Sequence, residues 1–428
     1  MSVCFAIVGS GPSGMYAADA LLKKFPNCSI DVFDKIPMPF GLIRYGVAPD
    51  HFKTKNTSRQ FLRTLELEQV RFIGNVEVGR DLSVEELKNN YDAVVYAIGA
   101  YNDRRLGIPG EDLPGVYGAC AFVGWYNAHP DYRDINPKLD GANAAVIGIG
   151  NVALDVCRVL SKTRNEMHGS DISTPALDTI QKMPIKSVHM FGRRGPIDAG
   201  FTPKELGEMR NLERCAAIVS SEQIPTEIAG DFDRREKGIK EKNLNILREL
   251  AAQDKHEKPV KMYFQFYSSP VEIIGTNRVE GIRLERTEVI DGNATATGDT
   301  YDISCCSVIT AIGYQATPPE GLSLDGAIVG NTDGWVRDNM YVVGWAKRGS
   351  MGTIPTNGPD SRRVIDLLVQ NIEKRGKIRI KPNRHTIDLL LSNRGVRVVS
   401  LKDMKKITIA EINNAQEERP WEKFTSIK

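Results

Sequence analysis

The chain has 428 residues, of which 41% are hydrophobic and 26% are charged, as is typical of a globular protein and not of a disordered one. Because this length exceeds that of an ordinary single domain, we expect two or three domains. Its 56 basic and 54 acidic residues leave a net charge of +2, so the overall charge gives no support for a nucleic-acid partner.

The seven cysteines form no CxxC or CxxxxC pair and no metal-ligand series. We therefore expect no metal site, reject a disulfide reductase, and predict reduced thiols, with Cys305 and Cys306 in the core. No apolar run approaches the ~18 residues of a membrane span. The chain enters an apolar strand at VCFAIVG, so we expect no signal peptide and a cytoplasmic protein, or alternatively a mature form in the mitochondrial matrix.

The first informative segment, CFAIVGSGPSGMYAADALLKKF, begins with an apolar strand, turns at three glycines and continues as an apolar-faced helix. Gly9 permits the tight turn, Gly11 lets a pyrophosphate approach the backbone, and Gly14 lets the helix pack closely on the strand. The next strand ends on Asp34, where a carboxylate can accept hydrogen bonds from ribose hydroxyls. This order of elements predicts a dinucleotide site with its phosphates at the helix N-terminus.

A second turn of the same kind lies in ANAAVIGIGNVALDV. Its G-x-G-x-x-A residues are Gly148, Ile149, Gly150, Asn151, Val152 and Ala153. After the next strand, Arg193 and Arg194 stand where an acidic residue is expected, and residues 163–183 form an insertion. Because a guanidinium can clasp the 2′-phosphate that a carboxylate would repel, the arginine pair predicts NADP rather than NAD.

Two turns in one chain predict two nucleotides, one bound permanently and one exchanging. Strands at 91–100 and 302–314 both end in Ala-Ile-Gly, and such strands commonly lead the chain between the nucleotide domains of a flavoprotein. The segment at 339–357 repeats the pattern of a strand followed by glycines, and we expect it to bring backbone N–H groups toward a flavin.

These segments together resemble the adrenodoxin-reductase type of ferredoxin–NADP⁺ reductase. The shared motifs are PFGLIRYGVAPDH, GIGNVALDV, GRRGP with FTPKEL, and GWAKRG with GTIPTN, while LLSNRGVRVVSLKDMKKI and RPWEKF match the family's C-terminal part. The resemblance implies an α/β fold with two Rossmann-like nucleotide-binding domains, the NADP domain being inserted in a split FAD domain. We expect the FAD domain at 1–106 and 317–428 and the NADP domain at 107–316.

The resemblance also implies site residues. Besides the glycines of the first turn, those expected at FAD are Ser13, Asp34, Leu42, Val78, Trp345, Gly352, Thr353 and Ile354. Those expected at NADP(H) are Ile149 to Val152, Arg193, Arg194 and Glu205, and Gly352 is expected to touch both cofactors. This sequence departs from the family at Asp34, where Glu is usual, and at Ser350, where Pro is common.

His51, Glu205 and Asp155 match polar residues near the contact between flavin and nicotinamide, and we expect them to be the catalytic set. His51 could manage a proton at the flavin, or it could only orient the loop after GVAP. Glu205 could be an acid of a helix's first turn that the helix dipole favours. Asp155 could be a solvated acid in the middle of a helix.

The resemblance implies an oxidoreductase that passes a hydride from NADPH to FAD and then single electrons to a small, acidic ferredoxin-type protein, which docks transiently. Two stretches, 53–64 and 234–248, each carry a net charge of +4 and could attract such a partner. The alternatives are an electron-input flavoprotein with another acceptor (a glutamate-synthase-like subunit, a flavodoxin reductase or a diaphorase), a flavin monooxygenase, or a non-enzymatic NADP(H)-binding redox sensor.

Overall fold

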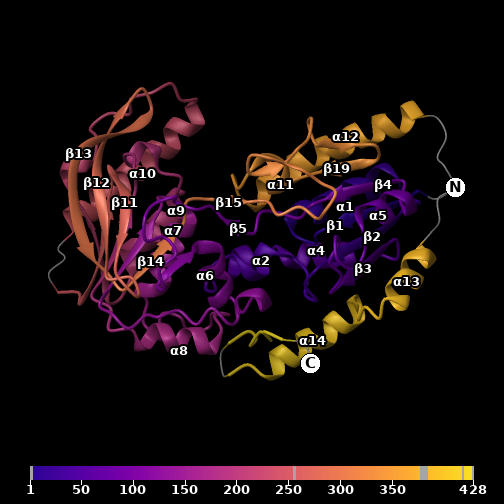
Figure 1. Cartoon of the computed structure of the whole chain (residues 1–428), viewed down its shortest axis with the longest axis horizontal. Helices are drawn as coiled ribbons and strands as arrows, with labels where there is room; N and C mark the ends of the chain where they lie inside the picture. Colours follow the sequence, from indigo (N-terminus) through magenta and orange to yellow (C-terminus); the bar gives the residue numbers. More distant parts are fainter. Residues whose placement is uncertain (1–2, 254–256, 376–383, 417–418, 427–428) are drawn as a thin grey trace. The chain divides into compact units, whose positions relative to one another are not determined.

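The computed structural model in Figure 1 describes residues 3–253, 257–375, 384–416 and 419–426. The chain divides into two compact units. Unit 1 comprises Met1–Val47, His51–Asn102 and Gly313–Phe424, and unit 2 comprises Ala48–Asp50, Asp103–Ile312 and Thr425–Lys428. The chain passes from unit 1 into unit 2 within strand β5 (Asn102–Asp103) and returns just before β15 (Tyr314–Gln315).

Unit 1 contains a largely parallel sheet. Its strands, in spatial order, are β18 (Trp335–Arg337), β19 (Met340–Val342), β4 (Ala93–Tyr96), β1 (Cys4–Val8), β2 (Ser29–Asp34), β3 (Val70–Gly74) and β20 (Val399–Ser400). The edge strands β18 and β20 are antiparallel to their neighbours, and the strands between them run parallel. All carboxyl ends of these parallel strands therefore lie at one edge of the sheet.

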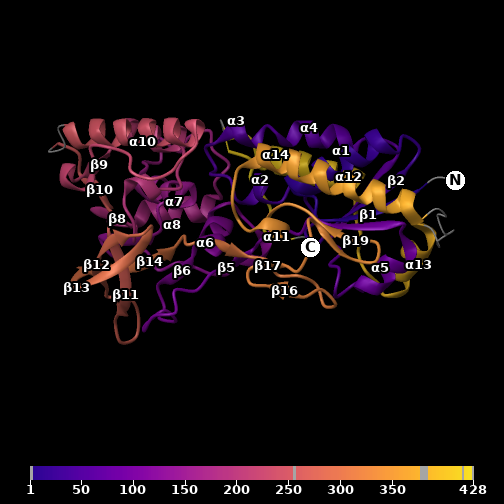
Figure 2. The ribbon, with the colours of Figure 1, turned by 90° about the horizontal axis from the view of Figure 1, so that it is seen from above.

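Helices cover both faces of this sheet. Phe5 and Ile7 of β1 pack into one buried cluster, whereas the alternate residues Ala6 and Val8 pack into another. The first cluster includes residues of α1 (Pro12–Lys24), α4 (Ser58–Leu65), α12 (Asn357–Arg375) and α14 (Leu401–Asn413), which lie on the same side of the strands in Figure 2. The second includes residues of α5 (Val84–Asn90) and α13 (Arg384–Asn393).

Short elements complete unit 1. They are α2 (Leu42–Tyr45), α3 (Phe52–Lys55), α11 (Trp345–Arg348), the 3₁₀ turn η5 (Ile354–Thr356), and the paired strands β16 (Leu324–Asp325) and β17 (Ile328–Val329).

Unit 2 contains a fully parallel sheet and a smaller antiparallel one. The parallel strands, in spatial order, are β6 (Val116–Gly118), β14 (Ser307–Thr310), β7 (Asn143–Ile147), β8 (Ser187–Phe191), β10 (Val260–Gln265) and β9 (Cys215–Val219). The antiparallel strands are β11 (Ser268–Ile274), β12 (Gly281–Ile290) and β13 (Asn293–Ser304). The two sheets share a core in which Phe191 of β8 packs with Ile282 and Leu284 of β12.

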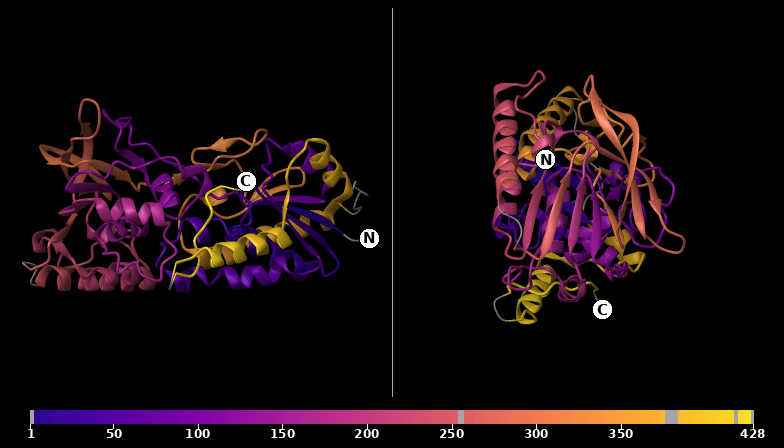
Figure 3. Two further views of the ribbon diagram at one scale, coloured as in Figure 1. Left: turned by 90° about the horizontal axis from the view of Figure 1, so that it is seen from below. Right: turned by 90° about the vertical axis from the view of Figure 1, so that its left-hand side faces the viewer.

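Helices cover the other face of the parallel sheet. Of the helices, α6 (Ala119–Tyr126), α7 (Asn151–Ser161) and α10 (Arg234–Ala252) contact its strands. The helix α8 (Thr174–Lys182) packs on α6, and α9 (Pro203–Gly207) packs on α7 and α10. The 3₁₀ turns are η1 (Pro130–Tyr132), η2 (Pro196–Asp198), η3 (Glu208–Asn211) and η4 (Ser221–Gln223). The right-hand view of Figure 3 shows α10 on one side of the parallel strands and the antiparallel hairpin on the other.

The prediction of an α/β fold with parallel sheets is confirmed. The single strand expected at 302–314 is wrong, because β13 ends at Ser304 and β14 begins only at Ser307. Between them the chain turns from the antiparallel sheet to the parallel one, and the N–H of Cys306 donates to the carbonyl of Asn143 at 3.0 Å. Cys305 and Cys306 are buried, as expected.

Candidate functional site

The first glycine turn follows β1 and begins α1. Gly9 has a φ of 107°, and a Cβ there would lie 2.3 Å from the carbonyl oxygen of Ala97, so only glycine fits. A Cβ on Gly14 would lie 2.0 Å from the carbonyl oxygen of Gly9, so the absence of a side chain at Gly14 lets α1 pack this closely on the turn after β1. A Cβ on Gly11, by contrast, would meet no atom within 4 Å. The backbone at Gly11 therefore faces open space at the N-terminus of α1, where anions bind favourably.

Asp34 ends β2 and is held by this turn. Its Oδ2 accepts the backbone N–H of Ser10 at 3.0 Å and also the hydroxyl of Ser10, while its Oδ1 accepts the N–H of Ile36 at 3.0 Å. Burial raises the pKa of Asp34, and the hydrogen bonds from Ser10 and Ile36 act against that rise. The carboxylate of Asp34, which is predicted to bind the ribose, is thus oriented by Ser10 of the glycine turn that leads into α1.

Ser13, in the first turn of α1, meets the C-terminal part of unit 1. Its hydroxyl donates to Oδ1 of Asn357 at 2.9 Å, and its carbonyl accepts the hydroxyl of Ser361 at 3.0 Å. A Cβ on Gly344, which has a φ of 71°, would lie 1.9 Å from the Ser13 hydroxyl. This contact brings the beginning of α11, and with it Trp345, to the N-terminus of α1.

Trp345 and the glycine segment after it form one connected loop. The indole N–H of Trp345 donates to the carbonyl of Met351 at 3.0 Å, and the amide side chain of Asn357 donates to the carbonyls of Thr353 and Ile354 at 3.1 and 3.2 Å. Gly352 has a φ of 87° and is exposed. The backbone from Gly352 to Ile354 is therefore held open to solvent beside the N-terminus of α12.

Leu42 and Val78 lie at the same edge of the unit 1 sheet. Leu42 begins α2, and a Cβ on the preceding Gly41 would lie 3.3 Å from the Cα of Gly11. Val78 follows the carboxyl end of β3 and is buried. The structure thus gathers the predicted residues of unit 1 at the carboxyl ends of its parallel strands, where open α/β sheets bind ligands.

Unit 2 repeats the turn between β7 and α7. Gly148 has a φ of 133°, and a Cβ there would lie 2.3 Å from the carbonyl oxygen of Ala311, whereas a Cβ on Gly150 would meet nothing within 4 Å. The carbonyl of Ile149 accepts the N–H of Gly200 at 2.8 Å, and the side-chain oxygen of Asn151 accepts the N–H of Thr202 at 2.8 Å. Residues 200–202 therefore line the turn, and Val152 follows within α7.

The two arginines follow β8 and differ in their surroundings. Arg193 is exposed and makes no ion pair with any residue that the structure describes. Arg194 is half-buried, and its guanidinium lies 3.3 Å from the carboxylate of Asp198 and 3.5 Å from the carbonyl oxygen of Gly292. Their backbone is fixed because the carbonyl of Arg193 accepts the hydroxyl of Thr287 at 2.7 Å.

Asp155 lies on α7 in a partly buried cluster of charges around Arg158, so the interpretation of it as a solvated acid is wrong. Its Oδ1 is 2.8 Å from the guanidinium of Arg158, a residue with 1% of its side chain exposed. Arg158 also pairs with Asp50, which accepts the ammonium of Lys162 at 2.6 Å, and lies 3.4 Å from Glu208. Burial disfavours the cation, but these carboxylates more than offset this and hold the pKa of Arg158 above its ordinary value.

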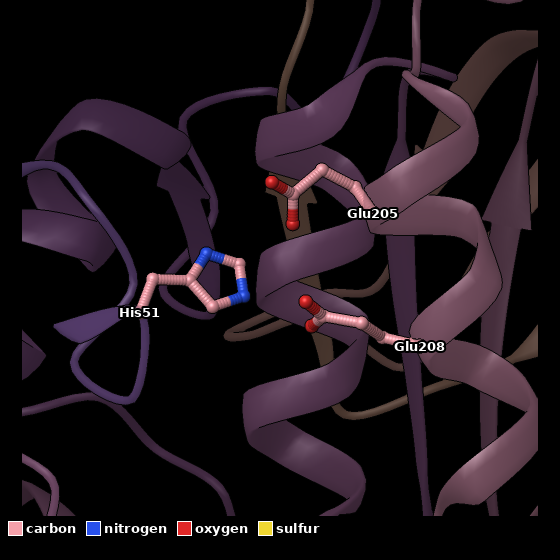
Figure 4. A group of neighbouring side chains, drawn as sticks. All are labelled: His51, Glu205 and Glu208. Atoms are coloured by element: carbon pink, nitrogen blue, oxygen red, sulfur yellow. The ribbon is translucent and has the colours of Figure 1, made fainter. Parts of the chain in front are cut away.

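Glu205 lies in the first turn of α9, and Glu208 begins the next turn, η3. Figure 4 shows both carboxylates projecting to the same side of this segment. The N–H of Glu205 donates to the hydroxyl of Thr202 at 3.4 Å, so the threonine begins the helix. His51, also drawn in Figure 4, belongs to unit 1, where it precedes α3 and accepts the N–H of Thr54 at 3.0 Å through its carbonyl.

Sequence reasoning missed Asp50, Arg158 and Glu208. The signal for Arg158 is its place in NVALDVCRVLS, where a cation interrupts an otherwise apolar helix face three residues after an acid. The other partners of Arg158, Asp50 and Glu208, are far away in the sequence and carry no local signal.

The two basic stretches are less uniform than their sequences indicate. In the first, Lys55 is buried with 4% exposure, which leaves Lys53, Arg59 and Arg63 at the surface. In α10, the ammonium of Lys240 donates to the carbonyl of Ile197 at 2.6 Å. The remaining cations that extend into solvent from the first half of this helix are Arg234, Arg235, Lys237 and Lys242.

None of the helices in the described parts of the chain combines the length and the apolar character that crossing a membrane requires.

Comparisons with known proteins agree with this geometry. Residues 4–183 match the family described as pyridine nucleotide-disulphide oxidoreductase. The chain is 42% identical to the NADPH-ferredoxin reductase FprA of Mycobacterium tuberculosis over 384 residues, which cover 86% of this chain and 83% of that protein. It is 38% identical to the mitochondrial NADPH:adrenodoxin oxidoreductase of Homo sapiens over 438 residues, which cover 96% of this chain and 87% of that protein.

The fold agrees as closely as the sequence. The structure of Mycobacterium tuberculosis FprA in complex with NADPH superposes with a TM-score of 0.95 at 37% identity, covering 100% of this chain and 98% of that one. The thioredoxin reductase of Lactococcus lactis, at 14% identity and a TM-score of 0.50, shares the fold alone.

Proposed function

Because this chain belongs to the family of NADPH-ferredoxin and NADPH:adrenodoxin reductases, we propose that it is a flavoprotein oxidoreductase that takes a hydride from NADPH and passes electrons singly to a ferredoxin-type iron–sulfur protein. The observation that carries this proposal is the pair of glycine turns, of which the second is followed by two arginines instead of an acid. A chain with one turn, or with an acid after β8, would not support two nucleotides of this kind.

The residues at both turns fit a bound dinucleotide. At Gly11 and at Gly150 an added Cβ would meet no atom within 4 Å, while the neighbouring Gly9 and Gly148 are packed tightly against backbone. The space at Gly11 and at Gly150 is therefore suited to a phosphate that approaches the main chain and the N–H groups at the start of a helix. We assign the turn of unit 1 to FAD and the turn of unit 2 to NADP(H), and we keep the domain limits expected from the sequence.

In unit 1, Ser13, Asp34, Leu42, Val78 and the loop from Trp345 to Ile354 are assigned to FAD. Asp34 is fixed by Ser10 at 3.0 Å, so its carboxylate is oriented before any ligand arrives. Gly352 offers a backbone without a side chain at the place assigned to both cofactors.

In unit 2, the 2′-phosphate is assigned to Arg193 and Arg194. Arg193 is exposed, so its guanidinium is available to a bidentate anion. Arg194 is already 3.3 Å from Asp198, so a phosphate must compete with that carboxylate. Ile149 to Val152 supply the start of α7 for the pyrophosphate.

When bound, FAD accepts the hydride of NADPH and releases the electrons one at a time. Few protein side chains need to react, so we assign positioning and proton roles to His51, Glu205 and Asp155. The unperturbed pKa of a histidine, about 6.5, suits proton exchange near neutrality. Asp155 is held by Arg158 at 2.8 Å, so its part is to orient this region and not to exchange protons freely.

We propose that the electron acceptor is small and acidic and docks transiently on the exposed cations of α10. Complementary charge speeds such encounters without demanding a permanent complex. The seven cysteines of the chain are free thiols, which favours a reducing compartment, namely the cytoplasm or the mitochondrial matrix.

Reduction of a two-iron ferredoxin by NADPH and the purified protein, followed by its absorbance change, tests this proposal. We expect turnover that requires both FAD and NADPH. An FAD-loaded protein that oxidises NADPH with oxygen but does not reduce the ferredoxin would contradict this proposal. A flavin that stays oxidised in NADPH would indicate a sensor.

A further inference from the structure

The C-terminal end of unit 1 folds back onto α14 and onto the short helix α2. We call residues 419–424 the C-terminal strap. Within it, the N–H of Glu422 donates to the carbonyl of Glu411 at 2.9 Å, and the N–H of Phe424 donates to Oε1 of Glu411 at 3.0 Å. The ammonium of Lys423 donates to the carbonyl of Arg44 at 3.2 Å. The strap is thus tied to one residue of α14 and to one residue of α2.

These two residues form a buried ion pair. The guanidinium of Arg44 lies 2.6 Å from both oxygens of the Glu411 carboxylate, and the side chains are 12% and 2% exposed. A carboxylate so deeply buried is stable only when its charge and its lone pairs are satisfied. Arg44 and the strap together provide those partners, although 367 residues separate Arg44 from Glu411 in the chain.

The other end of α2 touches the glycine turn of unit 1. The N–H of Phe40 donates to the hydroxyl of Ser10 at 3.2 Å, and the same hydroxyl donates to Asp34. Phe40 has a φ of 83°, a conformation that a bulky residue keeps only when its surroundings hold it. A helix of four residues is also too short to be stable alone. Ile43 and Tyr45 anchor α2 in the core of unit 1, and its two ends are further fixed by Ser10 on one side and Glu411 on the other.

We propose that Glu411, acting through Arg44 and together with the C-terminal strap, positions α2 against the glycine turn and so controls how tightly unit 1 holds FAD. The inference rests on the proposed function, which assigns FAD to this turn. Glu411 is a positioning residue, because its carboxylate contacts Arg44 and the strap and not the turn itself. Leu42 and Gly41 transmit the effect, since a Cβ on Gly41 would already lie 3.3 Å from the Cα of Gly11.

The test compares FAD binding with protein stability in three full-length variants. Glu411→Gln keeps the shape of the side chain and removes its charge. The double variant Arg44→Met with Glu411→Leu removes both charges, so that no buried charge lacks a partner. Lys405→Gln is the matched control, because Lys405 lies on the same helix and its ammonium pairs at the surface with Glu66, 2.5 Å away, and not with Arg44.

Each apoprotein is titrated with FAD by flavin fluorescence, its release of FAD is timed, and its melting temperature is measured without FAD. We expect Glu411→Gln to weaken FAD binding by at least about tenfold, equivalent to about 1.4 kcal/mol, mainly through faster release. The protection of the apoprotein by NADPH, which concerns unit 2, is expected to stay unchanged. For Lys405→Gln we expect unchanged FAD binding and release.

The double variant separates positioning from stability. We expect it to melt near the temperature of the unsubstituted apoprotein while its FAD binding stays weak, because α2 has lost its oriented contact and Phe424 its acceptor. If FAD binding recovers together with the melting temperature, the pair serves stability alone and the inference is overturned. If Glu411→Gln fails to fold, the FAD binding of the double variant tests the inference on its own: weak binding supports it and recovered binding overturns it.

The inference and the proposed function fail in different ways. Unchanged FAD binding in Glu411→Gln, with normal ferredoxin reduction by the unsubstituted protein, overturns only the inference. Absence of FAD binding by the unsubstituted protein overturns the proposed function and the inference with it.

Discussion

Replacing Arg193 by alanine should weaken NADPH binding more than replacing Arg194, although the two residues are adjacent. Arg193 is exposed and makes no ion pair with a described residue, so its whole guanidinium is available to the 2′-phosphate. Arg194 lies 3.3 Å from Asp198 and must exchange that partner for the phosphate. The net gain from Arg194 is therefore smaller.

The magnitudes follow from the contacts. A hydrogen bond to a charged group contributes roughly 1.5–3 kcal/mol, and we assign about 2 kcal/mol to Arg193, which corresponds to about a 30-fold rise in KM. For Arg194, the competing carboxylate reduces the gain to about 1 kcal/mol, or about fivefold. The KM for NADH, which lacks the 2′-phosphate, should change less than about twofold in both variants.

Steady-state reduction of a small dye with NADPH and with NADH provides both constants for each variant. Arg278→Ala is the matched control, since Arg278 is an exposed arginine of the same unit that pairs with Asp140 at 2.8 Å. Equal losses with both coenzymes would refute the assignment of the phosphate to these arginines. A larger loss for Arg194→Ala than for Arg193→Ala would refute the argument from Asp198.

Three further predictions concern the first turn, a half-buried histidine and the partner. Gly11→Ala should leave the apoprotein's melting temperature unchanged and abolish tight FAD binding. Gly14→Ala, whose Cβ would lie 2.0 Å from a carbonyl oxygen, should instead destabilise the apoprotein by about 3 kcal/mol. Equal melting temperatures of the two variant apoproteins would contradict this. Burial lowers the pKa of His189 to about 4, below its unfolded value of 6.5. Urea unfolding should therefore show stability lost as pH falls from about 6.5 to 4, by up to about 3 kcal/mol relative to His189→Gln. A pH-independent difference would argue against it. Ferredoxin reduction should slow steeply with added salt while dye reduction does not. The reason is that salt screens the attraction between the exposed cations of α10 and an acidic partner, which extends over only about 10 Å at about 0.1 M salt. A rate of ferredoxin reduction that does not change with salt would contradict docking on α10.

Local geometry explains why the two turns could be predicted. The conformations of Gly9 and Gly148 and the openness at Gly11 and Gly150 depend on a few consecutive residues and on the strand before them. The periodicity of β1 likewise predicts which residues face which helices. Such features are encoded within short stretches of sequence.

Features that depend on distant residues could not be predicted in the same way. The burial of Lys55 and the pairing of Arg158 with Asp50 arise from segments that meet only in the folded unit. Arg44 and Glu411 are 367 positions apart, and the residues around either one do not indicate the other. The break at Cys305 was missed because two buried cysteines join the end of β13 to the start of β14, so the segment looks like one apolar strand.

The most direct test of the central claim is rapid anaerobic mixing of the purified protein with NADPH or NADH while the flavin absorbance is followed. The account predicts a yellow protein that NADPH bleaches much faster than NADH at equal concentrations. A colourless protein, or one that NADH bleaches as fast as NADPH, would contradict it.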